Sequence, residues 1–142
     1  MKQQNYENHS KLDPMFHLGI ALLTLATLVL SILFYVTHVG EETLLSFVIL
    51  FGAIIFLLVM IRLRTYPLQV QDRVIRVEEN FRYYRLTGKA LDPKLSMKQI
   101  IALRFAPDEE LPGLVERTLA ENLEPKEIKQ AVQNWRADHY RV

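Results

Sequence analysis

Two long uncharged stretches dominate the first half of the chain. Residues 15–39 and residues 43–61 contain no Lys, Arg, Asp or Glu and consist mainly of Leu, Ile, Val and Phe. As helices they would measure roughly 35 Å and 28 Å, close to the ~30 Å hydrocarbon core of a bilayer. Neither stretch has the polar face that a helix needs at the surface of a soluble protein. The pattern therefore predicts two transmembrane helices.

The first stretch differs from a secretory signal. A signal has an apolar core of only about 7–15 residues, followed by a cleavage site with small residues. This stretch is longer, Phe34-Tyr35-Val36 offers no such site, and the second apolar stretch follows directly. We therefore expect residues 15–39 to remain in the protein as a span.

The flanking charges predict the orientation of the two spans. The link of residues 40–42 is short and acidic, so the helices should be antiparallel neighbours. Basic residues lie at the other ends, with Lys2 and Lys11 before the first span and Arg62 and Arg64 after the second. The positive-inside rule then places both termini in the cytoplasm and the link outside. We expect a multi-pass protein of the bacterial cytoplasmic (inner) membrane, with residues 1–14 as a cytoplasmic segment.

Small and hydroxyl-bearing residues interrupt the two apolar stretches. No charged residue lies at mid-membrane depth, which argues against a stand-alone transporter. The small residues could line a polar pathway, but they more commonly let two helices approach closely and form hydrogen bonds to the backbone. The candidates for such span packing are Thr24, Thr27, Ser31 and Gly52, with Ser46 and Ala53 beside them in the second stretch.

No motif for a cofactor, a metal or catalysis is present. His17 and His38 lie 21 residues apart, roughly 31 Å along a helix, so they cannot hold one haem. There is no cysteine, Gly-rich phosphate loop, Gly-x-Ser-x-Gly or zinc signature. The acidic run of residues 108–110 suits a helix N-terminus without any ion. We expect a protein that is not an enzyme and needs no cofactor or metal.

Residues 62–88 predict an amphipathic helix next to the membrane. Pro67 is expected to open this helix, and Gly88 to end it. Apolar residues repeat along it in alternating steps of four and three, which places them on one face. We call this face the valine–aromatic stripe, formed by Val70, Val74, Val77, Phe81 and Tyr84.

Three roles for the valine–aromatic stripe remain open. It could pack on the helices that follow, or it could form a short coiled coil with a partner or a second copy. It could also lie along anionic lipid, although acidic residues on the same helix weaken that interpretation.

Residues 89–142 predict a small three-helix domain. After a turn-like linker, Ser96 is expected to cap the first helix, with Gln99 at the capping-box position. The second helix should run from Pro107 to about Asn122, and the third should start at Glu124-Pro125. The predicted core is Phe105, Leu114, Leu119, Ile128 and Trp135. The fold class is therefore all-α: a two-helix transmembrane hairpin followed by a small cytoplasmic helical domain.

The charge balance argues against nucleic acid as a partner. The net charge of the chain is +1, and from Ser96 onward seven basic residues stand against eight acidic ones. Such a surface does not favour phosphate binding.

Several segments resemble a bacterial family of small two-span membrane proteins whose function is unknown. The resemblance lies in residues 71–80, 86–89, 99–106 and 134–139, and in the acidic run 108–110. It implies the two-span topology and a bacterial source, and it transfers no activity and no site residue.

Three functions are compatible with this organisation. The leading hypothesis is a non-enzymatic membrane protein whose cytoplasmic helices bind another protein or a second copy of the chain. The alternatives are an accessory subunit of a transporter or other membrane complex, and a membrane-tethered regulator that binds nucleic acid. Membrane lipid is an expected partner in all three.

Overall fold

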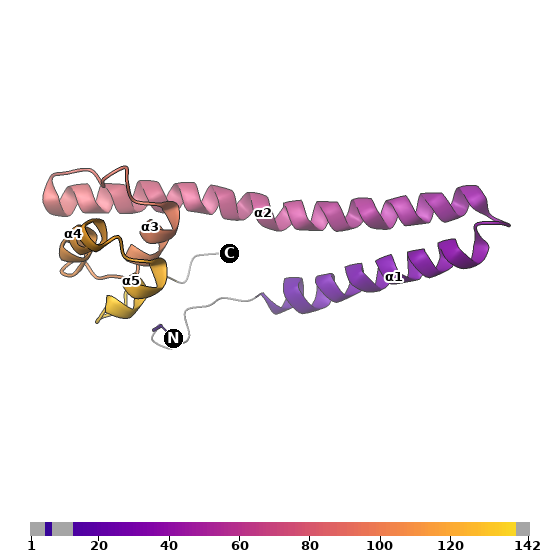
Figure 1. The fold of residues 1–142 in the computed structure, drawn as a ribbon, viewed down its shortest axis with the longest axis horizontal. Coiled ribbons are helices and arrows are strands. Elements are labelled where there is room, and N and C mark those ends of the chain that lie inside the picture. The colour runs from indigo at the N-terminus through magenta and orange to yellow at the C-terminus, as the bar shows by residue number, and fades with distance from the viewer. Residues whose placement is uncertain (1–4, 7–12, 139–142) are drawn as a thin grey trace. The chain divides into compact units, whose positions relative to one another are not determined.

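Helices make up the regular secondary structure of the described residues. The computed structural model describes residues 5–6 and 13–138, and Lys2 and Lys11, on which the predicted orientation partly rests, lie outside this range. The elements are a π-helix η1 (Met15–Ile20), α1 (Ala21–His38), α2 (Thr43–Thr87), α3 (Met97–Leu103), α4 (Leu111–Glu121) and α5 (Pro125–Ala131) (Figure 1). The all-α prediction is confirmed for this part of the chain.

The chain divides into two units, which we describe separately. The first unit covers Lys11–Pro67, and the second holds Leu68–Val142. Helix α2 contributes its N-terminal part to the first unit and its C-terminal part to the second.

Helix α1 and the first part of α2 run antiparallel in the first unit. Near the turn, the ring centroids of Tyr35 and Phe47 are 5.2 Å apart. At the opposite end of the helix pair, Cζ of Arg64 lies 5.8 Å from the ring centroid of Phe16. Helix α1 ends at His38, whose carbonyl oxygen accepts backbone hydrogen bonds from the turn. Both apolar stretches predicted from the sequence are helical, and both helices are long and apolar enough to cross a membrane.

Four small residues are buried where these two helices meet. Thr24 and Ser31 are buried in α1, and Ser46 and Ala53 are buried in α2. Each pair is seven residues apart, so each lies on one face of its helix. Thr27 and Gly52, the other two candidates predicted for span packing, are exposed on other faces.

The hydroxyl groups of α1 form hydrogen bonds within their own helix. Thr24 donates to the carbonyl oxygen of Ile20 at 2.8 Å, and Ser31 donates to that of Leu28 at 2.7 Å. The small side chains therefore shape the contact between the helices sterically, and they do not bridge it by these hydrogen bonds.

Helix α2 continues through Pro67 for 45 residues. The prediction that Pro67 opens a new helix is wrong, and the expected segments 43–61 and 62–88 are parts of one element. The proline ring fixes φ at a helical value, and the missing N–H deprives only the carbonyl group of Leu63 of its partner. The helix continues on both sides, where Leu63, Arg64, Leu68 and Gln69 are good helix formers. Gly88, with a φ of +71°, ends the helix as predicted.

Two of the three short helices of the second unit, α3 and α5, begin where the sequence predicts. The backbone N–H of Gln99 donates to the Ser96 hydroxyl, and the Gln99 side chain accepts from the backbone N–H of Ser96, so the predicted capping box is confirmed. Glu124 and Glu127 form an equivalent reciprocal pair at the start of α5. Helix α4 begins at Leu111, four residues later than expected, and ends at the left-handed residue Asn122.

The core of the second unit contains most of the predicted residues. Phe105 and Ile128 are fully buried and Leu114 is nearly so. Leu119 is 36% exposed, so its assignment to the core is wrong. Trp135 is partly buried and packs on Phe105 with the ring centroids 4.8 Å apart. It does so from a non-helical segment after α5, not from the helix itself.

Candidate functional site

The C-terminal part of α2 has two opposite faces with different environments. One face packs against the rest of the second unit through Ile75, Glu79, Arg82 and Tyr83, each 6% or 7% exposed. The valine–aromatic stripe lies on the other face, and its five side chains are between 48% and 69% exposed. The interpretation that this stripe packs on the helices that follow is therefore wrong. On that interpretation, the apolar face would make the contact with the helices that follow. A face that includes the charged residues Glu79 and Arg82 makes this contact instead.

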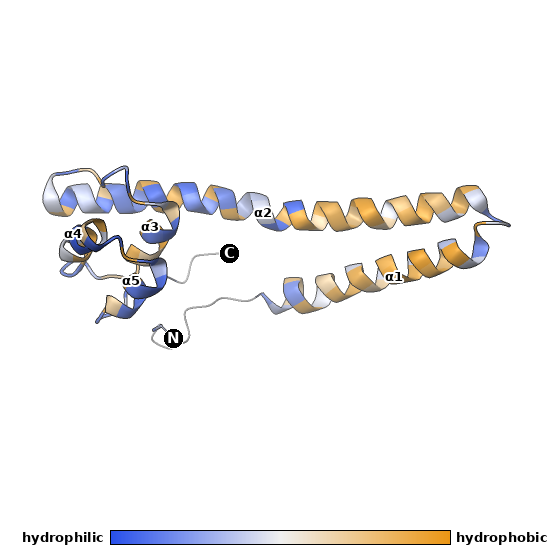
Figure 2. Ribbon diagram, in the orientation of Figure 1, coloured by the Kyte–Doolittle hydropathy of each residue, from blue (hydrophilic) through white to orange (hydrophobic). Residues whose placement is uncertain are grey.

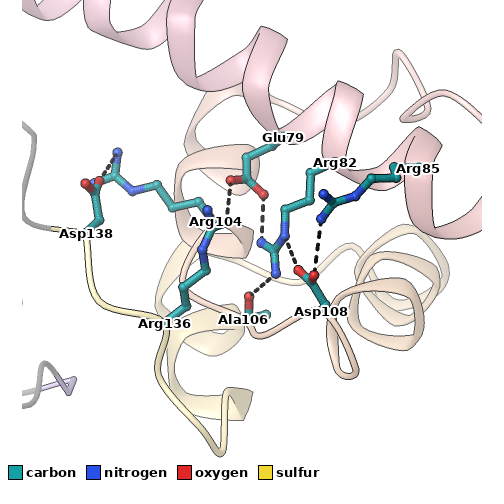
Figure 3. A network of polar contacts seen from close by, with 8 residues as sticks. All are labelled: Glu79, Arg82, Arg85, Arg104, Ala106, Asp108, Arg136 and Asp138. Carbon is teal, nitrogen blue, oxygen red and sulfur yellow. Dashed lines mark hydrogen bonds and ion pairs between the residues drawn. The ribbon is translucent and has the colours of Figure 1, made fainter.

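Arg82 is the centre of the buried face. Its Nε donates to Asp108 Oδ1 at 2.6 Å, its Nη1 to Glu79 Oε2 at 3.0 Å, and its Nη2 to the carbonyl oxygen of Ala106 at 2.8 Å (Figure 3). A planar guanidinium with several fixed donors can satisfy three acceptors at once, which the ammonium of lysine does less well. Arg82 thereby ties α2 to the segment between α3 and α4.

Three more arginines extend this arrangement. Arg136 Nη1 lies 3.2 Å from Glu79 Oε1, and Arg85 Nη2 lies 3.4 Å from Asp108 Oδ2. Arg104, which is buried, lies 3.3 Å from Asp138. We call the set the arginine–carboxylate cluster, formed by Glu79, Arg82, Arg85, Arg104, Asp108, Arg136 and Asp138 (Figure 3).

The arginine–carboxylate cluster lines a hollow of about 680 Å³. Glu78 joins the three carboxylates of the cluster at its wall, so four acidic residues face four arginines and the formal charges cancel. The hydrogen bond from Arg82 holds the pKa of Asp108 below its usual value, against the opposing effect of desolvation. A carboxylate stabilised in its ionised form is a weak base, which disfavours acid–base chemistry. The geometry fits a structural role, in which the cluster holds α2 and the segments after it together.

The acidic run 108–110 has a different role from the one expected. Asp108 pairs with arginines, and the side chain of Glu110 does not cap α4. Glu110 instead accepts the backbone N–H groups of Gln133 and Asn134, both at 3.0 Å. Together with the bond from Arg136 N–H to the Phe105 carbonyl oxygen at 2.8 Å, these contacts hold the segment after α5 against α3 and α4. A run of acids resembles a helix cap locally, and only the tertiary fold shows their partners.

No cluster suited to a metal occurs in the described part of the chain. His17 and His38 form local contacts, with Nδ1 of His17 2.9 Å from the carbonyl oxygen of Asp13 and Nδ1 of His38 2.6 Å from the Thr37 hydroxyl. The first unit has an apolar hollow of about 510 Å³ between its two helices, lined by residues such as Leu28, Leu57 and Arg64.

Comparisons with known proteins add a family and no activity. No curated protein and no solved structure matches the chain. A family model matches residues 1–142, the full length of the sequence. The chain therefore belongs to DUF6526, a family of unknown function.

Proposed function

We propose that this chain is a non-enzymatic membrane protein that binds another protein or a second copy through the valine–aromatic stripe. In this proposal α1 and the first part of α2 cross the bacterial cytoplasmic membrane as a hairpin. Both termini and the second unit then lie in the cytoplasm.

The exposure of the two apolar helices supports a membrane location. In their most apolar windows, only 11% of the residues of Met15–His38 and 17% of those of α2 are buried. The core helix of a soluble protein would bury most of such a window, because each exposed Leu or Phe side chain costs about 1.5–3 kcal/mol relative to burial. Figure 2 shows the hydrophobic colouring concentrated on α1 and the first part of α2. Lipid as the solvent for these side chains removes that cost.

The observation that carries the binding role is the exposure of the valine–aromatic stripe. Val77, Phe81 and Tyr84 are 69%, 66% and 57% exposed, although the same helix buries its opposite face. A contiguous apolar surface with aromatic residues is typical of protein interfaces. The arginine–carboxylate cluster fixes the helix on the second unit, so this surface is presented on a supported element.

The alternative functions have less support. Thr24, Thr27 and Ser31 donate to carbonyl oxygens of their own helix, which weakens a subunit role through hydroxyl-bearing faces. Nucleic-acid binding has less support because Arg104 and Arg136 pair with carboxylates.

Photo-crosslinking in native membranes tests the proposal. A photoreactive amino acid replaces Val77 in one full-length variant, and in the control it replaces Arg76, which is also exposed but lies about 100° around the helix. We expect a crosslinked product of higher mass from position 77 and little from position 76. If both positions yield only monomer, or the same products, the stripe does not bind a protein.

A further inference from the structure

We propose that the occupant of the valine–aromatic stripe is a second copy of this chain, aligned parallel and in register. This inference rests on the proposed function and specifies the partner of the same surface.

The spacing of the stripe matches a two-stranded coiled coil. Steps of four and three place Val74 and Phe81 at one core position of the heptad and Val70, Val77 and Tyr84 at the other. The residues that pack on the second unit lie on the far side of the helix. Two copies can therefore meet along the stripe without disturbing the core of either one.

The charges beside the stripe favour a parallel arrangement. In this register Arg73 and Glu78 occupy the two positions that flank the core, five residues apart. A parallel pair brings Arg73 of one copy close to Glu78 of the other, and symmetry repeats the contact. An antiparallel pair centred on Val77 would instead bring the two Glu78 carboxylates together. Both residues are exposed, and within residues 13–138 neither has an ion-pair partner.

Membrane anchoring would stabilise a coiled coil that is too short to form between free peptides. Five core residues form about two heptads, which is too few for a stable coiled coil between free peptides in solution. Copies inserted with the same sidedness are already aligned parallel, and confinement to a membrane raises their effective concentration. The two spans of the proposed topology therefore make a short parallel contact sufficient.

Disulfide crosslinking measures the contact and its orientation. The chain has no cysteine, so each variant carries a single thiol. Val77 is the midpoint of the stripe, and Val77→Cys should crosslink to its copy in either orientation. Val70→Cys should crosslink only in a parallel pair, because an antiparallel pair separates the two positions by about 21 Å. Arg76→Cys, on a different exposed face, is the matched control.

A charge exchange tests the role of Arg73 and Glu78. In the Val77→Cys background, Arg73→Glu or Glu78→Arg should lower the dimer fraction by about threefold, as expected for the loss of two exposed ion pairs. Combining the two substitutions should restore it. An unchanged melting temperature of each variant in detergent shows that the fold is retained.

The outcomes separate this inference from the proposed function. Dimers at positions 77 and 70 but not at 76, with rescue by the charge exchange, support a parallel second copy. A dimer at 77 without one at 70 overturns the parallel arrangement. If Val77→Cys couples only to another protein, self-association is wrong and the proposed function stands. If no product forms here or by photo-crosslinking, both are wrong.

Discussion

At the scale of single residues, Arg82 shows how charge holds α2 to the second unit. Its side chain is buried and contacts two carboxylates and one carbonyl oxygen, whereas Arg85 reaches one of the same carboxylates from an exposed position. Without Arg82, Oε2 of the buried Glu79 and the carbonyl oxygen of Ala106 lose the guanidinium donors, which costs more than losing an exposed pair. The two arginines therefore form a matched pair for mutation.

Substituting lysine at these two positions should have very different effects. We expect Arg82→Lys to lower the free energy of unfolding of the second unit by about 3 kcal/mol, because the three acceptors bind three different nitrogen atoms of Arg82, whereas lysine has one nitrogen to place among them. Arg85→Lys should change it by less than about 1 kcal/mol. The only tryptophan, Trp135, packs on Phe105 and reports unfolding by its fluorescence. Equal losses in the two variants would show that the three contacts of Arg82 do not stabilise the unit.

Asp108 should make the stability of the second unit depend on pH. Its pKa is lowered in the folded state, chiefly by the hydrogen bond from Arg82. Its contribution is therefore complete above the unfolded pKa of about 4 and disappears as the pH falls through the lower folded value. Asp108→Asn should be less stable at pH 7 and should lose less stability between about pH 5 and pH 3. Chemical denaturation followed by Trp135 fluorescence measures the free energy of unfolding of the original chain and of the variant at each pH. If both lose stability equally as the pH falls, Asp108 does not cause the pH dependence.

At the scale of elements, the ends of the helices follow from local sequence. Ser96, Gly88 and Glu124 act at caps, where the preference arises from residues within one turn, so the sequence predicted those three boundaries. The prediction that Pro67 opens a new helix was wrong because a proline can stand at a helix start and can also be accommodated in a helix interior. Local sequence cannot distinguish these two cases when the flanking residues favour a helix on both sides.

Two glycines test the account of the helix ends. Gly88 has a φ of +71°, whereas Gly113 lies in α4 without a positive φ, and an added Cβ would have open space at both. We expect Gly88→Ala to destabilise the second unit by about 1 kcal/mol through backbone strain. Gly113→Ala should stabilise it by about 0.5 kcal/mol through helix propensity. The melting temperature should fall for Gly88→Ala and rise for Gly113→Ala. An unchanged or higher melting temperature of Gly88→Ala would show that the end at Gly88 is not strained.

At the scale of the whole molecule, the sequence predicted the helical class and the two apolar helices, but not the candidate site. The apolar helices are evident because their pattern is continuous over 25 and 19 residues. Within the arginine–carboxylate cluster only Glu79 and Arg82 are close in sequence. Its other contacts join residues 23 to 57 positions apart, and no local period marks such pairs. The face of α2 that packs on the rest of the second unit includes Glu79 and Arg82. The spacing of apolar residues does not predict a packed face that contains charged residues.

The proposed topology is tested most directly by labelling single cysteines in intact bacterial cells. Glu41 lies in the turn between the two helices and Lys126 lies in α5, and both are exposed. With a maleimide that does not cross membranes, we predict that Glu41→Cys reacts in intact cells, whereas Lys126→Cys reacts only after permeabilisation. If Glu41→Cys also requires permeabilisation, or if Lys126→Cys reacts in intact cells, the two helices do not cross the membrane with both termini inside.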